Sequence, residues 1–208
     1  MNRSEIAALL RPYVELSPTQ LDNISIYIDI LLKWNSRVNL TAVRRLDEIV
    51  QRHFGESFFV AARLLHASDT TSAIDLGSGA GFPGIPLAMF ALRSTVTLIE
   101  SNGKKAAFLN EVVRTLNLNH VTVFNRRAED YSGQAQLVTM RAVEKFEKAA
   151  KLALKLVEPG GRLALMIGSA QINIAEGISR NLSWQGPTII PGGHSRVLLV
   201  GTKTVRVE

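Results

Sequence analysis

The spacing of hydrophobic and polar positions along this 208-residue chain changes near residue 72. In the first third, Ser17-Pro18-Thr19-Gln20 has the pattern of a helix capping box, and apolar side chains recur behind it at helical spacing. The expected apolar stripe consists of Leu21, Ile24, Ile28, Leu31 and Leu32, closed by Trp34. A second helical pattern runs from about Asp47 to Leu65. We therefore expect a helical front section.

From Ser72 onward, short apolar runs alternate with longer amphipathic stretches. The runs predict strands at Ala73–Leu76, Thr95–Glu100, Val121–Phe124, Leu137–Thr139, Arg162–Ile167 and Val197–Thr202. The stretches between them predict helices at Ile85–Leu92, Lys104–Leu116, Glu144–Val157 and Ile172–Asn181. Such an α/β alternation is typical of a mainly parallel sheet that is covered on both faces. Because these sheets bind ligands at the carboxyl ends of their strands, we expect the chemistry just after the first four strands.

Length and composition indicate one compact domain. Residues 1–66 are expected to form a helical extension packed on a core of residues 67–208. Hydrophobic residues make up 46% of the chain and charged residues 20%, which is ordinary for a globular protein. The absence of cysteine excludes disulfides and thiolate metal sites, and the four histidines have no metal-ligand spacing, so no metal is expected.

The apolar stretch near the N-terminus is too short for a signal peptide, and the longest uncharged run, Leu76–Leu92, contains four glycines and two prolines. We therefore expect a cytoplasmic protein without membrane association. The net charge of +6 favours a polyanionic partner, above all nucleic acid, although a basic protein without such a partner is the alternative. Nothing in the sequence requires a dimer, so a monomer is expected.

The segment Asp75-Leu76-Gly77-Ser78-Gly79-Ala80-Gly81 follows a predicted strand and precedes a predicted helix. Glycines at this place allow a tight turn and a close approach of the backbone to a ligand. The glycines at 79, 81 and 84 also satisfy the dinucleotide-binding pattern, so a dinucleotide-dependent oxidoreductase is an alternative.

Charge distinguishes the two cofactor classes. A carboxylate at Asp75, beside the glycine loop, would repel a pyrophosphate but suits the ammonium and sulfonium of S-adenosylmethionine. Glu100 ends the second predicted strand, where an acid accepts hydrogen bonds from ribose hydroxyls in either cofactor class. The alternative is that both acids are purely structural, with Asp75 as a helix cap and Glu100 just before the helix that follows Asn102. The sequence favours S-adenosylmethionine.

Several segments together resemble one family. They are Trp34-Asn35, Asn39-Leu40-Thr41, Arg52-His53 with Ser57, Ile74 to Ala88, Lys104-Lys105 with Phe108-Leu109, Arg127-Ala128-Glu129, and Arg141-Ala142. This combination resembles the bacterial guanine-N7 methyltransferases of small-subunit (16S) ribosomal RNA, once called glucose-inhibited division protein B. The resemblance spans roughly Ile24 to Val200, and the glycine segment combined with Asn39-Leu40-Thr41 is its specific part.

The resemblance implies a Rossmann-like class I methyltransferase, with a mainly parallel seven-stranded sheet and an antiparallel last strand. It implies methyl transfer from S-adenosylmethionine to N7 of a guanine in 16S rRNA or the small ribosomal subunit. The cofactor-binding residues that we expect are Asp75, Gly77, Gly79, Phe82, Glu100, Ala128, Glu129 and Arg141, with Ala128 and Glu129 along the adenine. The chain departs from the family pattern at Ala80, where proline is usual, at Gly55-Glu56-Ser57, and at Ile167, where lysine is usual.

Guanine N7 has a free lone pair and no proton, so the expected reaction needs no general base, and we name no catalytic residue with certainty. Arg141 is a candidate, because its guanidinium could donate to guanine O6, a phosphate or a cofactor carboxylate. Further candidates for substrate contact are Asn39, Arg52, His53 and Arg196. The sequence is also compatible with a catalytically silent RNA-binding protein, or with a methyltransferase that acts on another RNA or on a small molecule.

Overall fold

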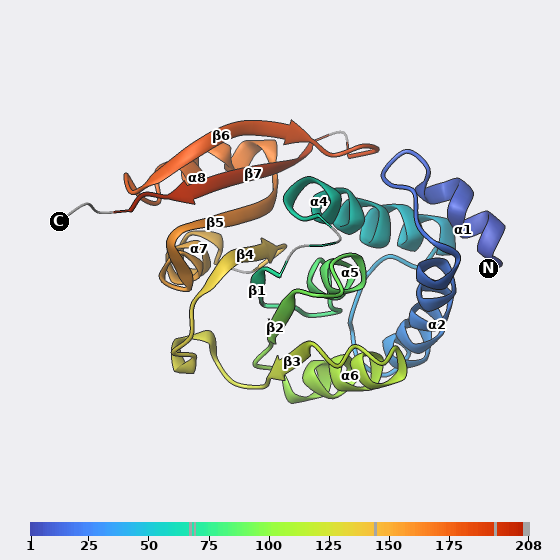
Figure 1. The fold of residues 1–208 in the computed structure, drawn as a ribbon. Coiled ribbons are helices and arrows are strands. Elements are labelled where there is room, and N and C mark those ends of the chain that lie inside the picture. The colour runs from blue at the N-terminus through green and yellow to red at the C-terminus, as the bar shows by residue number, and fades with distance from the viewer. Residues whose placement is uncertain (67, 69, 144, 194, 206–208) are drawn as a thin grey trace.

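A computed structural model describes residues 1–66, 68, 70–143, 145–193 and 195–205. Its centre is a seven-stranded sheet in the order β3-β2-β1-β4-β5-β7-β6 (Figure 1). The strands are β1 Ser72–Leu76, β2 Thr95–Ile99, β3 Val121–Phe124, β4 Ala135–Arg141, β5 Val157–Gly168, β6 Leu182–Ile189 and β7 Arg196–Lys203. The first five strands run parallel, whereas β7 pairs antiparallel with both β5 and β6. The expected Rossmann-like sheet with an antiparallel last strand is confirmed.

Helices cover both faces of the sheet (Figure 1). One side carries α1 Arg3–Leu10, α2 Pro18–Asn35, α3 Leu46–Glu48, the π-helical turn η1 Ile49–Gly55, α4 Glu56–Leu64, α5 Gly84–Phe90 and α6 Gly103–Thr115. The other side carries α7 Phe146–Lys155 and α8 Ile172–Glu176. Short 3-10 turns occur at η2 Ala128–Asp130 and η3 Ser169–Gln171.

The alternation of side chains along each strand divides the interior into two apolar cores. Along β5, Ala164 and Met166 belong to the core under the front helices, whereas Leu163 and Leu165 belong to the core under α7 and α8. Because both faces are buried, the strands read as nearly continuous apolar runs, which is why the sequence reveals most of them.

The capping box at the start of α2 is confirmed. The Ser17 hydroxyl accepts a hydrogen bond from the Gln20 amide at 3.3 Å, and Gln20 Oε1 accepts one from the Ser17 amide at 2.9 Å. Gln20 Nε2 also donates to the Met89 carbonyl at 3.0 Å, which ties this cap to the end of α5. The prediction that Leu32 belongs to the buried apolar stripe of this helix is wrong, because Leu32 is 39% exposed. Trp34, which was expected to close the stripe, is only partly buried.

Other elements differ from the expectation. The second helical stretch runs from Leu46 to Leu64, but its middle is the π-helical turn η1. Helix α8 is shorter than expected and ends before Gly177. The sequence analysis predicts no residue range for helix α1 or for the seventh strand of the sheet, β6. Strand β6 is mostly exposed at the edge of the sheet, and its pairing with β7 is irregular between Gln185 and Thr188, where Gly186-Pro187 lies. Glu144, the expected start of one helix, and residue 67, at the expected boundary, lie outside the described residues.

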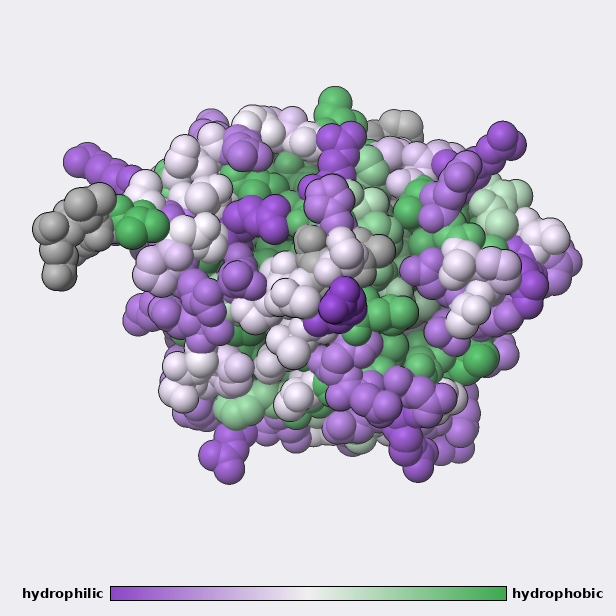
Figure 2. Space-filling view, viewed as in Figure 1, coloured by the Kyte–Doolittle hydropathy of each residue, from purple (hydrophilic) through white to green (hydrophobic). Residues whose placement is uncertain are grey.

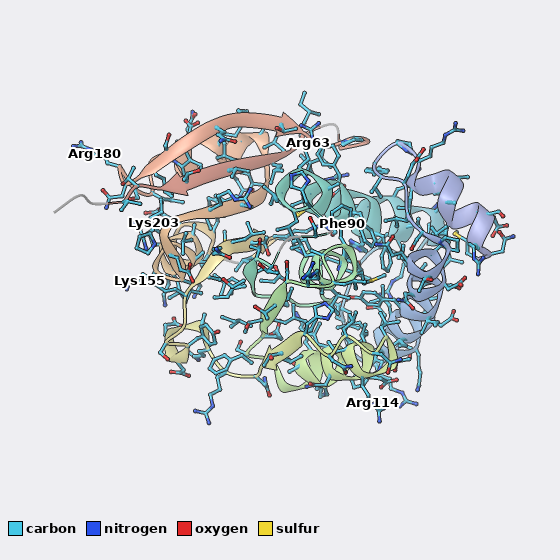
Figure 3. All side chains as sticks on the ribbon, in the orientation of Figure 1. Arg63, Phe90, Arg114, Lys155, Arg180 and Lys203 are labelled. Carbon is cyan, nitrogen blue, oxygen red and sulfur yellow. The ribbon has the colours of Figure 1, made fainter. Side chains whose placement is uncertain are left out.

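The surface is predominantly polar on the face that Figure 2 shows, where hydrophilic side chains surround smaller apolar areas. Figure 3 shows Arg114 and Arg180 projecting from the periphery, Arg180 at the far end of the β6–β7 arm. Lys203, the last residue of β7, donates to the carbonyls of Leu154 and Val157 and so ties β7 to the end of α7 and the start of β5. None of the described helices is long and apolar enough to cross a membrane.

The cap of α2 generates a stability prediction. Replacing Ser17 with alanine leaves the Gln20 amide without its acceptor, so we expect Ser17→Ala to lower the free energy of unfolding by about 1 kcal/mol. Denaturant titration followed by circular dichroism measures this change. Ser17→Asp, which keeps a side-chain acceptor, serves as the control, and an equal loss in both variants would contradict the role of the cap.

Candidate functional site

A cavity of about 470 Å³ opens at the carboxyl ends of β1, β2 and β4, where parallel sheets bind ligands. It contains the glycine loop, the start of α6, the end of β4 and parts of the front section. The described residues that line it are Leu40, Thr41, His53, Gly77, Ser78, Gly79, Ala80, Phe82, Glu100, Ser101, Asn102, Lys105, Arg141, Ala142 and Val143. The site lies where the strand pattern predicts it.

The glycine loop needs its glycines. Gly77, Gly79 and Gly81 have φ values of +70°, +55° and +83°, a conformation that side chains with a Cβ rarely adopt. A Cβ at Gly77 would stand 3.1 Å from Val143 Cγ2, and one at Gly81 would collide with the Tyr27 hydroxyl. The loop can therefore bring its backbone directly to the cavity.

Helix α2 supports this loop through Tyr27. The Tyr27 hydroxyl donates to the Ala80 carbonyl at 2.5 Å, and its ring stacks on Phe82 at 5.4 Å. His53 lies against Phe82 as well, at 5.0 Å between ring centroids. Burial raises the pKa of Tyr27 well above its ordinary 10, so it stays a hydrogen-bond donor. The sequence analysis missed Tyr27 because a tyrosine within an apolar helical stripe looks like an ordinary core residue.

Asp75 lies beneath the loop and not at its mouth. Its side chain is 1% exposed; Oδ1 accepts a hydrogen bond from the Thr139 hydroxyl at 2.8 Å, and Oδ2 accepts one from the Gly84 amide at 3.2 Å. Burial raises the pKa of Asp75 to about 6, against the opposing effect of these hydrogen bonds. The prediction that the Asp75 carboxylate stands at the mouth of the glycine loop, next to the ligand, is wrong, because the side chain points under α5. A role of Asp75 in cofactor binding stays a prediction.

Glu100 is the carboxylate that lines the cavity, as expected from its place after β2. It is 8% exposed; Oε2 accepts from the Gly79 amide at 2.9 Å and Oε1 from the Asn102 amide at 2.8 Å. Each oxygen can accept a second hydrogen bond. Its contact with a ribose stays a prediction.

Ala128 and Glu129 line a separate depression of about 450 Å³, together with Tyr131 and Lys155 among others. This depression lies beside α7 and the starts of β4 and β5 and does not share a lining residue with the cavity at the glycine loop. The expected contact of Ala128 and Glu129 with an adenine therefore receives no support from these cavities and stays a prediction.

A second cavity, of about 190 Å³, adjoins the first and shares Arg141, Ala142 and Val143 with it. The other described residues that line it are Arg52, Met140, Phe146, Met166, Ile167, Gly168, Gln171 and Arg196. Arg141 Nη2 donates to the Arg52 carbonyl at 2.7 Å and lies 3.3 Å from Glu56 Oε2. The structure thus brings three of the expected arginines together at one cavity. Ile167, at a departure from the family pattern, is a buried part of its wall.

His53 lies beside the first cavity with both ring nitrogens engaged. Nε2 is 2.7 Å from the Thr41 hydroxyl, and Nδ1 is 3.4 Å from Arg141 Nη2. Burial, together with the charges of Arg141, Arg52 and Arg196, lowers the pKa of His53 to about 3, so the ring is neutral at physiological pH. With Arg141 as donor to Nδ1, the proton of the ring lies on Nε2.

Asn39 is the substrate candidate that the structure does not bring to these cavities. Its side chain is exposed, on the segment just before Leu40, which lines the first cavity. Within the described part of the chain, no group of three or more histidine or acidic side chains could hold a metal ion.

Comparison with known proteins identifies the family of the chain. Residues 20–186 match the family model described as rRNA small subunit methyltransferase G. A protein of that name from Roseiflexus castenholzii is 40% identical over 91% of this chain and 86% of its own length, and one from Streptococcus pyogenes is 30% identical over 90% and 85%.

Solved structures show the same fold. An S-adenosylmethionine-dependent methyltransferase from Aquifex aeolicus aligns with a TM-score of 0.63 at 12% identity, over 80% of this chain and 97% of its own. The TYW2 protein of M. jannaschii, solved in complex with AdoMet, aligns with a TM-score of 0.57 at 20% identity, over 73% and 75%. Fold, sequence match and length agree: the chain belongs to the family of rRNA small subunit methyltransferase G.

Proposed function

We propose that this protein transfers the methyl group of S-adenosylmethionine to N7 of a guanine in 16S ribosomal RNA. The observation that carries the proposal is the pairing of two adjoining cavities in a chain of this family. One has a glycine loop and a carboxylate, and the other is lined by arginines. Arg141 belongs to both, so it lies where cofactor and acceptor would meet.

The first cavity fits the cofactor. The backbone at Gly77 and Gly79 is open to it, and Glu100 offers acceptor lone pairs for ribose hydroxyls. Its volume of about 470 Å³ is within the range of small-molecule sites. When bound, S-adenosylmethionine supplies an electrophilic methyl group on a sulfonium. Buried Asp75 and the lining Glu100 place negative charge next to the glycine loop, where it disfavours a diphosphate, although Lys105 and Arg141 line the same cavity.

Because guanine N7 attacks with its own lone pair and carries no proton, the side chains of the site act by positioning the guanine and the cofactor. A neutral His53 with both nitrogens engaged holds Arg141 and Thr41 in place and is not free to take a proton. Tyr27 and Phe82 stack on each other beneath the glycine loop and hold it in place, with Phe82 lining the cavity. Rate enhancement then comes from holding acceptor and methyl donor in line.

The proposed acceptor agrees with the charge of the chain. A 16S rRNA substrate, free or within the small ribosomal subunit, fits the formal charge of +6, since phosphates bind to basic surfaces. We propose that the enzyme acts in the cytoplasm and as a monomer. A silent RNA-binding protein would bind S-adenosylmethionine without transferring its methyl group.

Methyl transfer tests the proposal directly. Small ribosomal subunits from cells that lack this enzyme should accept radiolabelled methyl groups, and mapping should find the label on N7 of one guanine in 16S rRNA. Subunits that already carry the modification are the control and should take up no label. Label on protein, on another RNA or on a small molecule would refute the assigned acceptor.

Glu100 generates a prediction on cofactor affinity. Glu100→Gln removes a charged acceptor and turns an amide donor toward the Gly79 or Asn102 amide, so we expect the Kd for S-adenosylmethionine to rise by about tenfold or more. Isothermal titration calorimetry measures the change. Glu176→Gln, at an exposed position on α8, is the matched control. Unchanged affinity in Glu100→Gln would remove this residue from the cofactor site.

The buried Asp75 generates a prediction on pH. Its folded-state pKa, about 6, lies above the ordinary 3.8, so its stabilising contribution is fully present below pH 3.8 and is lost as the pH rises through 6. Between pH 4 and 7, wild type should lose about 2 kcal/mol of unfolding free energy relative to Asp75→Asn. Denaturant titrations at several pH values measure both proteins, and parallel pH curves would show that Asp75 is not the titrating group.

A further inference from the structure

Two arginines that line the second cavity are paired with one buried carboxylate, which is not itself among the described lining residues. Glu56, at the start of α4, is 1% exposed and faces two guanidiniums that come from β4 and β7, the strands on either side of β5. Arg196, at the start of β7, places Nε and Nη2 at 2.7 and 2.6 Å from Glu56 Oε1. Arg141, at the end of β4, places Nη2 at 3.3 Å from Oε2. One carboxylate is thus shared by two arginines.

This arrangement leaves positive charge uncompensated at the cavity. Arg52 lines it too, and its own carbonyl accepts a hydrogen bond from Arg141. Two guanidiniums therefore share a single carboxylate, the charge of the exposed Arg52 acts on Arg141 as well, and the neighbouring His53 is neutral. Buried Asp75 offsets part of this positive charge at Arg141. The side chain of Arg141 is only 12% exposed, so water screens its charge poorly. A cavity with this charge and size attracts an anion.

The chemistry of the proposed reaction indicates which anion. Methyl transfer to N7 makes the guanine cationic, so guanidiniums packed around the base would oppose the reaction. A phosphate group of the RNA strand, in contrast, neutralises them and matches the planar donor forks of two arginines. The volume of about 190 Å³ suffices for a phosphate with its ester oxygens.

We propose that this cavity binds a backbone phosphate next to the methylated guanine, and that Glu56 is the positioning residue that holds Arg141 and Arg196 against that phosphate. The proposal rests on RNA as the acceptor. Without the carboxylate, two guanidiniums this close would repel each other, and Arg196, whose side chain is 32% exposed, would turn toward solvent. Glu56 itself contacts neither cofactor nor substrate in this assignment.

Steady-state methyl transfer to unmodified small subunits tests the proposal in Arg196→Gln, Glu56→Gln and Glu56→Asp. We expect Arg196→Gln and Glu56→Gln to raise KM for the subunit by about tenfold, with kcat and the Kd for S-adenosylmethionine within about twofold of wild type. Losing one phosphate contact should also reduce the slope of log KM against log salt by about 0.7. Glu56→Asp, which restores the charge, should recover part of the loss.

Arg180→Gln is the matched control, because Arg180 is an exposed arginine at the far end of the β6–β7 arm (Figure 3). It should keep the KM and salt slope of wild type. An unchanged KM in Arg196→Gln would overturn the phosphate site. A matching loss of cofactor affinity would overturn it too, since the anion would then be the carboxylate of the cofactor. If Glu56→Gln does not fold by circular dichroism, Arg196→Gln and Glu56→Asp decide the outcome.

A binding experiment separates this proposal from the proposed function. Guanosine 5′-monophosphate should shift amide resonances around residues 168, 171 and 196 in wild type but not in Arg196→Gln, whereas guanosine should not shift them in either protein. If these shifts occur while no RNA accepts a methyl group, the anion site stands and the acceptor assignment fails. If guanosine shifts the same resonances as its monophosphate, the cavity binds the base and the phosphate site is refuted.

Discussion

The geometry of the site depends on the buried carboxyl group of Asp75. One of its oxygens is bonded to Thr139 of β4 and the other to the amide of Gly84 at the start of α5, so it joins two strands and a helix below the glycine loop. A Cβ at residue 84 would stand within 2.8 Å of Asp75, which is why glycine is required there. With both ends of the loop fixed, Tyr27 needs only one hydrogen bond to Ala80 to hold its middle. The shape of the cavity therefore depends on buried contacts beneath the glycine loop, which do not line the cavity.

The front section is part of the site and not an attachment to it. Tyr27 supports the glycine loop, His53 lies against Phe82 and bonds Thr41, and Glu56 holds two arginines of the core. Through these contacts the helical extension holds both the glycine loop and the ends of core strands. The charged side chains of the two cavities differ in kind: Glu100 lines the first together with Lys105 and Arg141, whereas the charged residues of the second are the arginines at 52, 141 and 196. Among the described lining residues, a carboxylate is thus available only in the first cavity, and the second favours an anion.

Sequence alone could predict the residues that lie at strand ends. Gly77, Glu100 and Arg141 follow β1, β2 and β4 or end them, and the ends of parallel strands meet at one edge whatever their order. It could not predict that Asp75 points under α5, because alternation along a strand does not say which helix covers each face. Glu56 and Arg196 are 140 residues apart, and their pairing depends on β7 lying next to β5. Strand β6 escaped detection because an exposed edge strand carries no apolar run.

The titratable groups at the first cavity restrict the kind of acceptor it can serve. Among the described lining residues these are His53, Glu100, Lys105 and Arg141. His53 has a pKa of about 3 and two engaged nitrogens, while both oxygens of Glu100 hold backbone amides in place. His53 is therefore not a proton acceptor at physiological pH. The remaining lone pairs of Glu100 are those that the proposed ribose contact uses. With these groups committed to the loop and the cofactor, the site suits an acceptor that reacts through an exposed lone pair and has no proton to lose, and guanine N7, the proposed acceptor, is of this kind.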